Sequence, residues 1–211
     1  MRDTKQAAKS NLTIKSDRSR LFDIAAQQSG YFTSAQAAES GYSRALLAHH
    51  AKSGKFIRVR RGLYRFREYP PSPREHVLAA WLAVGKIHAV VSHESALELL
   101  GLSDVVPDAV HLTVPRSKRS LPSISGVKVH TSSRPIGKNE RAVRDGIAVT
   151  SPSRTILDAA ESGVAPEQIE DAVAQAVARG LVSPDRLLQA AAERGKRVMD
   201  LVDQSLAEAR A

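Results

Sequence analysis

The run of residues from Lys55 to Arg67 has the clearest capacity for chemistry in this sequence. It reads K-F-I-R-V-R-R-G-L-Y-R-F-R, so cations alternate with apolar residues on both sides of Gly62. A period of two is typical of β-strands, and a glycine favours a tight turn between them. Lys and Arg bind phosphates, which makes this segment a candidate basic hairpin for contacting a polyanion. The alternation predicts one face with Ile57, Val59, Tyr64 and Phe66 and an opposite face with Arg58, Arg60, Arg65 and Arg67.

The distribution of charge along the chain points to the same chemistry. Of the 211 residues, the first 70 hold 14 Lys and Arg against 5 Asp and Glu, which accounts for the whole net charge of +9. Neutralising phosphates releases condensed counterions, so a concentrated basic region favours a nucleic acid as the partner. A membrane surface is the weaker interpretation, because these cations have no continuous apolar helix face opposite them.

Three short helices are predicted ahead of the hairpin. The first lies within residues 16–29, Thr33 is expected to cap the second with Gln36 at the capping-box position, and Ser43 is expected to cap the third. Three helices followed by a hairpin make a winged helix-turn-helix, which we place at residues 17–69. The third helix is predicted to turn Leu47, His50 and Ala51 inward and Arg44, His49 and Lys52 outward.

The winged helix-turn-helix fold predicts how these side chains would meet DNA. The third helix enters the major groove, where Ser43 and Arg44 at its N-terminus are placed for base edges. The hairpin arginines would hold phosphates or reach the minor groove. The predicted DNA-binding residues are Ser43, Arg44, His49, Lys52, Lys55, Arg58, Arg60, Arg61 and Arg65.

The proline-rich segment Pro70–Pro73 is the predicted linker, because it coincides with the change in charge. Residues 1–16 are expected to form a flexible basic tail. Beyond the linker the fold class expected is α+β, a mixed α/β domain over residues 74–211 that ends in a helical bundle. Its predicted elements are helices at 74–84 and 92–100, strands at 87–91, 109–114, 127–131 and 146–150, and helices only from Ser151 onward.

Catalytic chemistry has little support in the sequence. The segment Ser92-His93-Glu94-Ser95 contains hydrolase residue types, but neighbours on one helical turn cannot form a relay, so we interpret Ser92 as a helix N-cap. Seven histidines are scattered without H-x-x-x-H or H-E-x-x-H spacing, and cysteine is absent, so we expect no metal site. We also expect no cofactor, since there is no glycine-rich phosphate loop. Asp158 is expected to pair with Arg154 one helical turn before it.

Four ordered segments resemble the AbiEi family of antitoxins from type IV toxin-antitoxin systems, from about Leu21 to the C-terminal helices. They are G-Y-F-T-S-A-Q-A-A-E-S-G-Y-S-R with the later R-R-G-L-Y, then V-S-H-E-S-A-L-E-L-L-G-L, V-H-L-T-V-P and D-G-I-A-V-T-S-P-S-R-T-I-L-D. The resemblance implies a repressor that binds its own promoter, as a dimer or as cooperative monomers on an inverted repeat. It also implies a C-terminal antitoxin domain that counteracts a nucleotidyltransferase-like toxin, with no stable complex between the two.

A second basic stretch runs from Arg116 to Arg144, with eight Lys or Arg and Glu140 as its one acid. It is either a solvated loop, an auxiliary DNA surface, or a surface that faces the toxin or its nucleic-acid substrate. The candidate residues are Arg116, Lys118, Arg119, Lys128 and Arg134.

Two other functions stay open from the sequence. A stand-alone winged-helix regulator of other genes would share every DNA-binding feature, and a toxin gene immediately downstream would distinguish the two. A nucleic-acid-processing enzyme would need a divalent metal, for which the sequence offers no ligand set. The charged start and the lack of any apolar run of about 18 residues lead us to expect a soluble cytoplasmic protein.

Overall fold

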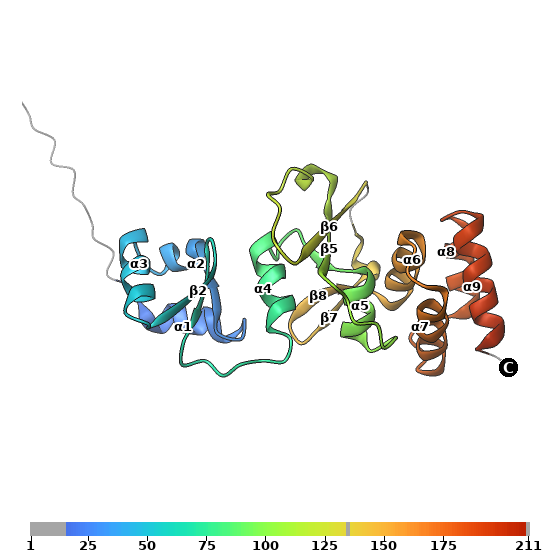
Figure 1. Ribbon diagram of the computed structural model, residues 1–211, viewed down its shortest axis with the longest axis horizontal. Helices are drawn as coiled ribbons and strands as arrows, with labels where there is room; N and C mark the ends of the chain where they lie inside the picture. The colour runs from blue at the N-terminus through green and yellow to red at the C-terminus, as the bar shows by residue number, and fades with distance from the viewer. Residues whose placement is uncertain (1–15, 134–135, 210–211) are drawn as a thin grey trace, which may run out of the picture. The chain divides into compact units, whose positions relative to one another are not determined.

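A computed structural model describes residues 16–133 and 136–209 of the chain (Figure 1). The chain divides into two compact units, Met1–Pro71 and Ser72–Ala211, and the division falls inside the proline-rich segment. Most of the predicted tail, residues 1–15, lies outside the described residues, as does Arg134.

The first unit contains three helices and a small antiparallel sheet. Its strands lie in the order β1-β3-β2. Its elements are α1 (Arg18–Ala26), β1 (Tyr31–Thr33), α2 (Ser34–Glu39), α3 (Arg44–Lys52), β2 (Phe56–Arg60) and β3 (Leu63–Phe66).

Side-chain caps fix the starts of these helices, as the sequence predicts. The hydroxyl of Thr33 accepts from the backbone N–H of Gln36, and the Gln36 side chain accepts in return from the N–H of Thr33. Ser43 accepts from the N–H of Leu46 at 3.1 Å. Such caps satisfy backbone donors that a helix leaves without partners, so α2 and α3 begin at defined residues.

The register of the hairpin differs from the predicted alternation. Phe56 lies opposite Phe66 and Ile57 lies opposite Arg65, so Ile57 and Phe66 lie on different faces. The pairing also shifts between Arg58 and Arg60. The prediction that Ile57 and Val59 share an apolar face with Phe66 is therefore wrong. On β2 the residues that face the core alternate from Phe56, one position earlier than predicted. An aromatic core results, built on Phe32, Phe56 and Phe66.

The second unit combines a mixed five-stranded sheet with six α-helices among the described residues (Figure 1). The strand order is β6-β5-β4-β8-β7, in which β5 and β6 are parallel, as are β4 and β8. Its strands are β4 (Val90–Val91), β5 (Val110–Pro115), β6 (Val127–Ser132), β7 (Arg141–Arg144) and β8 (Ile147–Thr150). Its helices are α4 (Glu75–Val84), α5 (His93–Leu100), α6 (Pro152–Ser162), α7 (Pro166–Ala178), α8 (Pro184–Ala192) and α9 (Lys196–Glu208).

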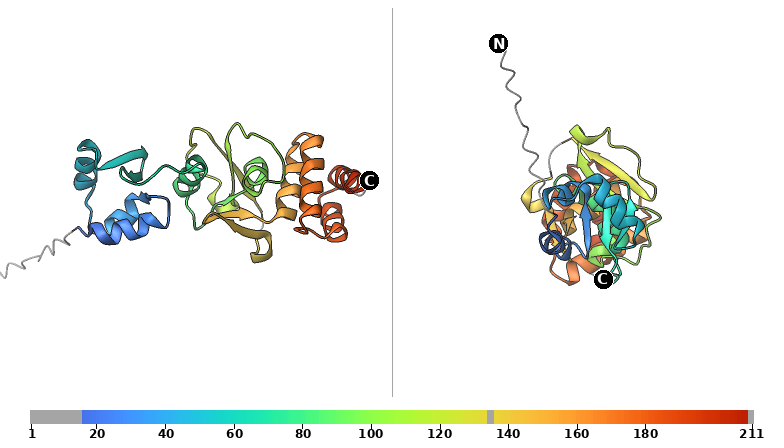
Figure 2. Two further views of the ribbon diagram at one scale, coloured as in Figure 1. Left: turned by 90° about the horizontal axis from the view of Figure 1, so that it is seen from below. Right: turned by 90° about the vertical axis from the view of Figure 1, so that its left-hand side faces the viewer.

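The last four helices share one hydrophobic core with α5, and they lie side by side in the orange and red part of Figure 2. Three of them begin with a proline, at Pro152, Pro166 and Pro184. Proline suits this first position because its missing N–H would have no partner inside the helix. Ile156, Val173 and Val202 are fully buried in this core.

These two sheets with their helices confirm the expected mixed α+β class. The strand expected from Ile87 is shorter than predicted, because Ile87 is 79% exposed and β4 begins only at Val90. Strand β7 was not expected. Within residues 16–133 and 136–209, none of the helices has the length and apolar character to span a membrane.

Candidate functional site

Helix α3 presents the side chains that the sequence singled out for base contact. Arg44 is its first residue and is exposed, and Ser43 caps it. His49 and Lys52 are exposed as well, while Leu47 is buried in the core. The helix thus has a basic outer face and an apolar inner face, as predicted.

His50 lies at the edge of the aromatic core rather than on the outer face of α3. Its ring centroid is 5.1 Å from that of Phe56 and 5.8 Å from that of Tyr42. Burial, with Lys55 and His49 nearby, lowers the pKa of His50. The side chain therefore stays neutral at pH 7 and takes the place of an apolar core residue.

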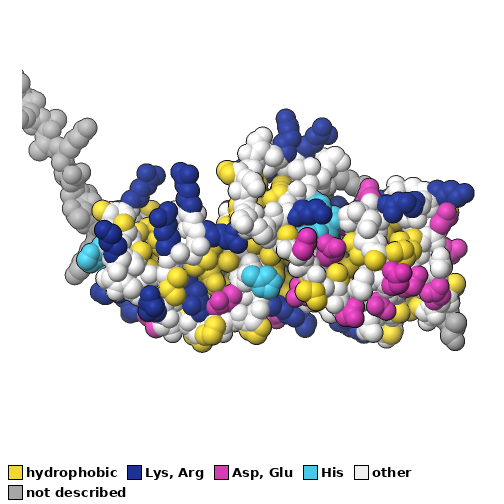
Figure 3. Space-filling view, viewed as in Figure 1, with side chains coloured by type: hydrophobic (Ala, Val, Ile, Leu, Met, Phe, Trp, Pro, Cys, Tyr) yellow, Lys and Arg dark blue, Asp and Glu magenta, His cyan; other side chains and the backbone are white. Residues whose placement is uncertain are grey.

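The hairpin carries most of the remaining predicted cations on its surface. Lys55, Arg58 and Arg61 are exposed, and Arg60 is partly exposed. Gly62 makes the turn with φ of 76°, a left-handed conformation that disfavours a side chain. On the face shown in Figure 3, Lys and Arg side chains gather over this unit, whereas Asp and Glu gather over the C-terminal helices.

Arg65 does not belong to this exposed set. It is only 8% exposed, its Nη2 donates to the backbone oxygen of Tyr69 at 2.7 Å, and its guanidinium lies 5.8 Å from the ring centroid of Tyr31. The hairpin register causes this, because it puts Arg65 opposite both Tyr31 and Ile57. The prediction that Arg65 contacts DNA is therefore corrected to a structural role.

The second basic stretch is exposed where the structure describes it. Arg116 and Lys118 lie in a short 3-10 helix after β5, Arg119 follows it, and all three are exposed. Lys128 is exposed on β6. Figure 3 shows Lys and Arg side chains at the tip of the segment that joins β5 to β6.

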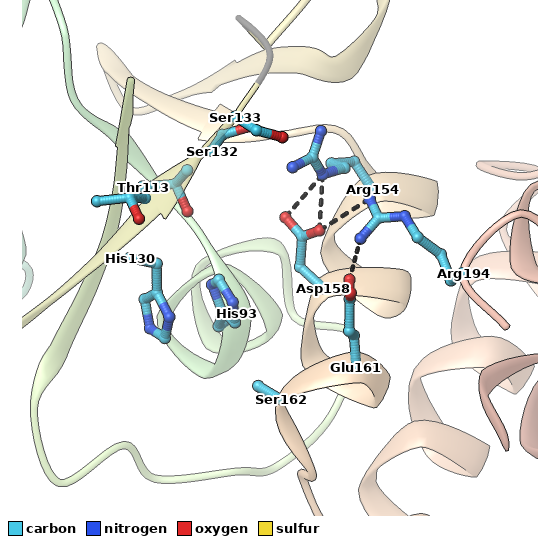
Figure 4. Close-up of a pocket in the computed structure, with 11 residues that line it drawn as sticks. His93, Thr113, His130, Ser132, Ser133, Arg154, Asp158, Glu161, Ser162 and Arg194 are labelled. Atoms are coloured by element: carbon cyan, nitrogen blue, oxygen red, sulfur yellow. Dashed lines mark hydrogen bonds and ion pairs between the residues drawn. The ribbon is translucent and has the colours of Figure 1, made fainter. Parts of the chain in front are cut away.

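A polar cavity of about 460 Å³ lies in the second unit (Figure 4). It forms where α5, β5 and β6 meet α6 and the turn between α8 and α9. Its lining includes His93, Thr113, His130, Arg154, Asp158 and Arg194.

An ion network forms one wall of this cavity. Nε of Arg154 donates to both carboxylate oxygens of Asp158, at 2.7 and 2.8 Å, which confirms the expected pair. Arg154 also donates to Glu140 at 2.9 Å, and Arg194 pairs with both Asp158 and Glu161. Burial alone would lower the pKa of Arg154, but Asp158 and Glu140 raise it above its ordinary value. Arg154 thus stays charged, and both arginines are matched by carboxylates.

The opposite wall includes His93 and His130, which with His111 behind them form a cluster of three histidines that the sequence did not indicate. The rings of His93 and His130 stack with centroids 3.6 Å apart and planes inclined by 14°. His130 Nε2 lies 3.4 Å from His111 Nδ1. The parallel pairing of β5 with β6 brings His111 and His130 together, and the N-terminus of α5 adds His93. No spacing within a single element could have revealed this cluster, because each histidine comes from a different element.

All three imidazoles are held in the neutral form. Burial, with the neighbouring histidines, lowers the pKa of His93 to about 2. Burial also lowers the pKa of His130 to about 4 and that of His111, although Glu94 opposes the shift at His111. Neutral imidazoles keep a lone pair free on one ring nitrogen.

Ser92 occupies the N-cap position of α5, but its side chain has another role. Its hydroxyl lies 2.8 Å from His93 Nδ1 and accepts from Thr113 at 2.8 Å. Ser92 is therefore the N-cap residue, as predicted, but its side chain makes no capping hydrogen bond. The Ser92 hydroxyl bonds to Thr113 on β5 and to His93 rather than to the N–H groups of α5, so it orients the His93 imidazole.

Comparison with known proteins agrees with this two-part architecture. Residues 19–67 match a family described as "Transcriptional regulator, AbiEi antitoxin" and residues 88–207 match the "AbiEi antitoxin C-terminal domain". Both descriptions name regulators or antitoxins rather than enzymes. No curated protein matches the chain.

The fold is similar to that of a solved structure, the crystal structure of the RV2827C protein from Mycobacterium tuberculosis, with a TM-score of 0.61 and 19% identity. The similarity covers 90% of this chain and 76% of that one. At this identity the similarity concerns the fold alone.

Proposed function

The chain belongs to the AbiEi antitoxin family, and from that premise we propose that it represses its own operon by binding DNA and counteracts a nucleotidyltransferase-like toxin. The first unit is the proposed DNA-binding domain, and residues 74–211 are the proposed antitoxin domain. The observation that carries the DNA-binding part is the basic outer face of α3 beside the exposed cations of the hairpin.

We assign the first unit as a winged helix-turn-helix. Helices α2 and α3 are joined by a short turn in which Gly41 has φ of 81°, and strands β2 and β3 form the wing. A tight turn with a glycine between two short helices is typical of the helix-turn-helix. In such a fold α3 lies in the major groove, and Ser43 and Arg44 reach base edges.

The proposed contacts divide by the kind of readout. Arg44 reads bases, since a guanidinium can bond guanine O6 and N7 together. His49, Lys52, Lys55, Arg58, Arg60 and Arg61 bind phosphates and fix the position of the protein on the duplex. Two copies of the chain would bind an inverted repeat as a dimer or cooperatively, and steric exclusion of polymerase would cause repression.

Fluorescence anisotropy of the full chain with its own upstream DNA and with a scrambled duplex tests this assignment. We expect preference for the upstream DNA by several kcal/mol. Arg44→Ala should lose about 1–3 kcal/mol of that preference, whereas Arg20→Ala, which removes an exposed arginine of α1, should leave it unchanged. Equal, strongly salt-dependent binding to both duplexes would contradict autoregulation.

The second basic stretch is proposed to make auxiliary contacts with DNA, or to face the toxin or its nucleic-acid substrate. Reversing the charge of Arg116, Lys118 and Arg119 should weaken operator binding or toxin neutralisation, measured by anisotropy and by growth on co-expression of the neighbouring toxin gene. Because no stable complex with the toxin is proposed, growth rather than co-purification is the measurement. If both readouts stay intact, this stretch is an ordinary solvated surface.

A further inference from the structure

The histidine cluster beside the cavity has the ligand types of a transition-metal site. His93, His111 and His130 each offer one ring nitrogen, and these three atoms all lie within 4.8 Å of one another. Neutral imidazole is the form that binds metal, and it suits zinc, copper and nickel. His93 and His111 are buried, and His130 is partly buried.

The distances in the cluster approach those of a tetrahedral site. Zinc–nitrogen bonds of about 2.0–2.1 Å place two ligand nitrogens about 3.4 Å apart. His111 Nδ1 and His130 Nε2 are separated by 3.4 Å. The nitrogen that His93 offers lies within 4.8 Å of the other two, and metal binding would require the imidazole stacked on His130 to shift toward them.

The partners of the histidines match those of metal ligands. His111 Nε2 lies 3.0 Å from Glu94 Oε2, which leaves Nδ1 directed at His130. Ser92 and Thr113 form a hydrogen-bonded chain that holds Nδ1 of His93. Carboxylates and hydroxyls of this kind orient ligating histidines and fix which nitrogen is free.

The backbone of His93 supplies an independent observation. Its φ is 54°, in the left-handed region that a non-glycine residue rarely occupies. Backbone strain of this kind persists where the surroundings over-determine it, often at functional sites. Here it turns the imidazole of the first residue of α5 toward β5 and β6.

The charges around the cavity favour a cation over a phosphate. The arginines that line it, Arg154 and Arg194, are paired with Asp158 and Glu161, and Glu140 adds a further carboxylate to Arg154. Three carboxylates against two guanidiniums leave no net positive charge in the cavity for an anion, and beside His111 the acids Glu94 and Asp108 offset Lys128.

We propose that His93, His111 and His130 form a binding site for a divalent transition metal, with Zn²⁺ as the best fit. Three histidines with a cavity beside two of them resemble the open type of zinc site, in which the fourth position takes water or a ligand oxygen. The site goes beyond the proposed repression and neutralisation, because neither requires a metal.

Metal titration of the untagged full chain tests the site. After chelator treatment, the protein is titrated with Zn²⁺ at pH 7.5 against a chromophoric zinc indicator, and with Co²⁺, whose visible absorption reports tetrahedral coordination. We expect one tight Zn²⁺ per chain and a tetrahedral Co²⁺ spectrum. The affinity should fall at least about 100-fold in His93→Asn and His130→Gln, and about 10- to 100-fold in Ser92→Ala.

The variants are chosen so that a folding defect can be told from a lost ligand. Asparagine tolerates the left-handed backbone of residue 93, so His93→Asn should keep its circular dichroism spectrum. His88→Gln is the matched control, since His88 is an exposed histidine of the same unit. Absence of stoichiometric zinc binding, or full binding by folded His93→Asn and His130→Gln, would overturn the proposal. Loss of binding in Asp108→Asn, with binding retained by folded His93→Asn and His130→Gln, would also overturn it, because the metal would then lie among Glu94, Asp108 and His111.

Discussion

Arg154 and Asp158 form a buried ion pair within one turn of α6, in which the single Nε–H of the arginine is shared between both carboxylate oxygens, at 2.7 and 2.8 Å. Less than a tenth of either side chain is exposed. Burial raises the pKa of Asp158, and the two arginines oppose that shift. Charges removed from water in this way are stable only while each has its partner.

Asp158→Asn should therefore destabilise the second unit by about 3–5 kcal/mol, because Arg154 and Arg194 lose their shared carboxylate. Urea unfolding followed by the fluorescence of Trp81, the sole tryptophan, measures this. Asp145→Asn is the control, since the Arg74–Asp145 pair is largely exposed and should cost about 1 kcal/mol or less. Equal losses in the two variants would contradict the assignment of Asp158 as the centre of the network.

Gly30→Ala should destabilise the first unit more than Gly54→Ala. Both glycines have left-handed backbones, with φ of 85° and 75°, where a side chain costs about 1–2 kcal/mol. A Cβ at residue 30 would also overlap Cβ and Cγ of Tyr69, whereas one at residue 54 would meet Arg67 at an ordinary 3.6 Å. Overpacking adds about 1–3 kcal/mol. Hydrogen exchange of the amides in β1 and β3 measures the difference, and equal effects would refute the close approach of Tyr69.

Local signals in the sequence predicted the ends of elements well. The caps at Thr33 and Ser43 depend on neighbours three residues away, so they could be predicted without knowledge of the fold. The helical class of the C-terminal region followed from the same short-range pattern.

Features that depend on pairing between distant strands were not predictable. The core face of the hairpin is set by the register of Phe56 against Phe66 and by the irregularity at Arg58, which alternation alone does not reveal. The histidine cluster depends on Thr113 lying beside His130 in the parallel pair of β5 and β6. Residues 93, 111 and 130 look scattered in the sequence because only tertiary structure brings them together.

Arg58 and Arg65 should respond differently to substitution, although they lie on adjacent strands. Arg58→Ala removes an exposed cation, so the slope of log affinity for DNA against log salt should become shallower by about 1. Arg65→Met should leave that slope unchanged and lower stability instead, because Arg65 is buried against Tyr31 and Tyr69. Anisotropy at a series of salt concentrations measures the slopes. A shallower slope for Arg65→Met would restore Arg65 to the DNA contacts.

Stability of the metal-free second unit should fall as the pH is lowered from 6.5 to 5. The pKa of His93 is lowered to about 2 and that of His130 to about 4, so both stay neutral in the folded protein in this window. The unfolded chain, with histidine pKa values near about 6.5, takes up protons there and is favoured. Each neutral histidine contributes a slope that approaches about 1.4 kcal/mol per pH unit.

Urea unfolding followed by Trp81 fluorescence, with chelator present, measures how the stability changes with pH. His93→Asn and His130→Gln should each flatten it, while His88→Gln should not, and a slope unaffected by either cluster variant would contradict the neutral, buried state of these imidazoles.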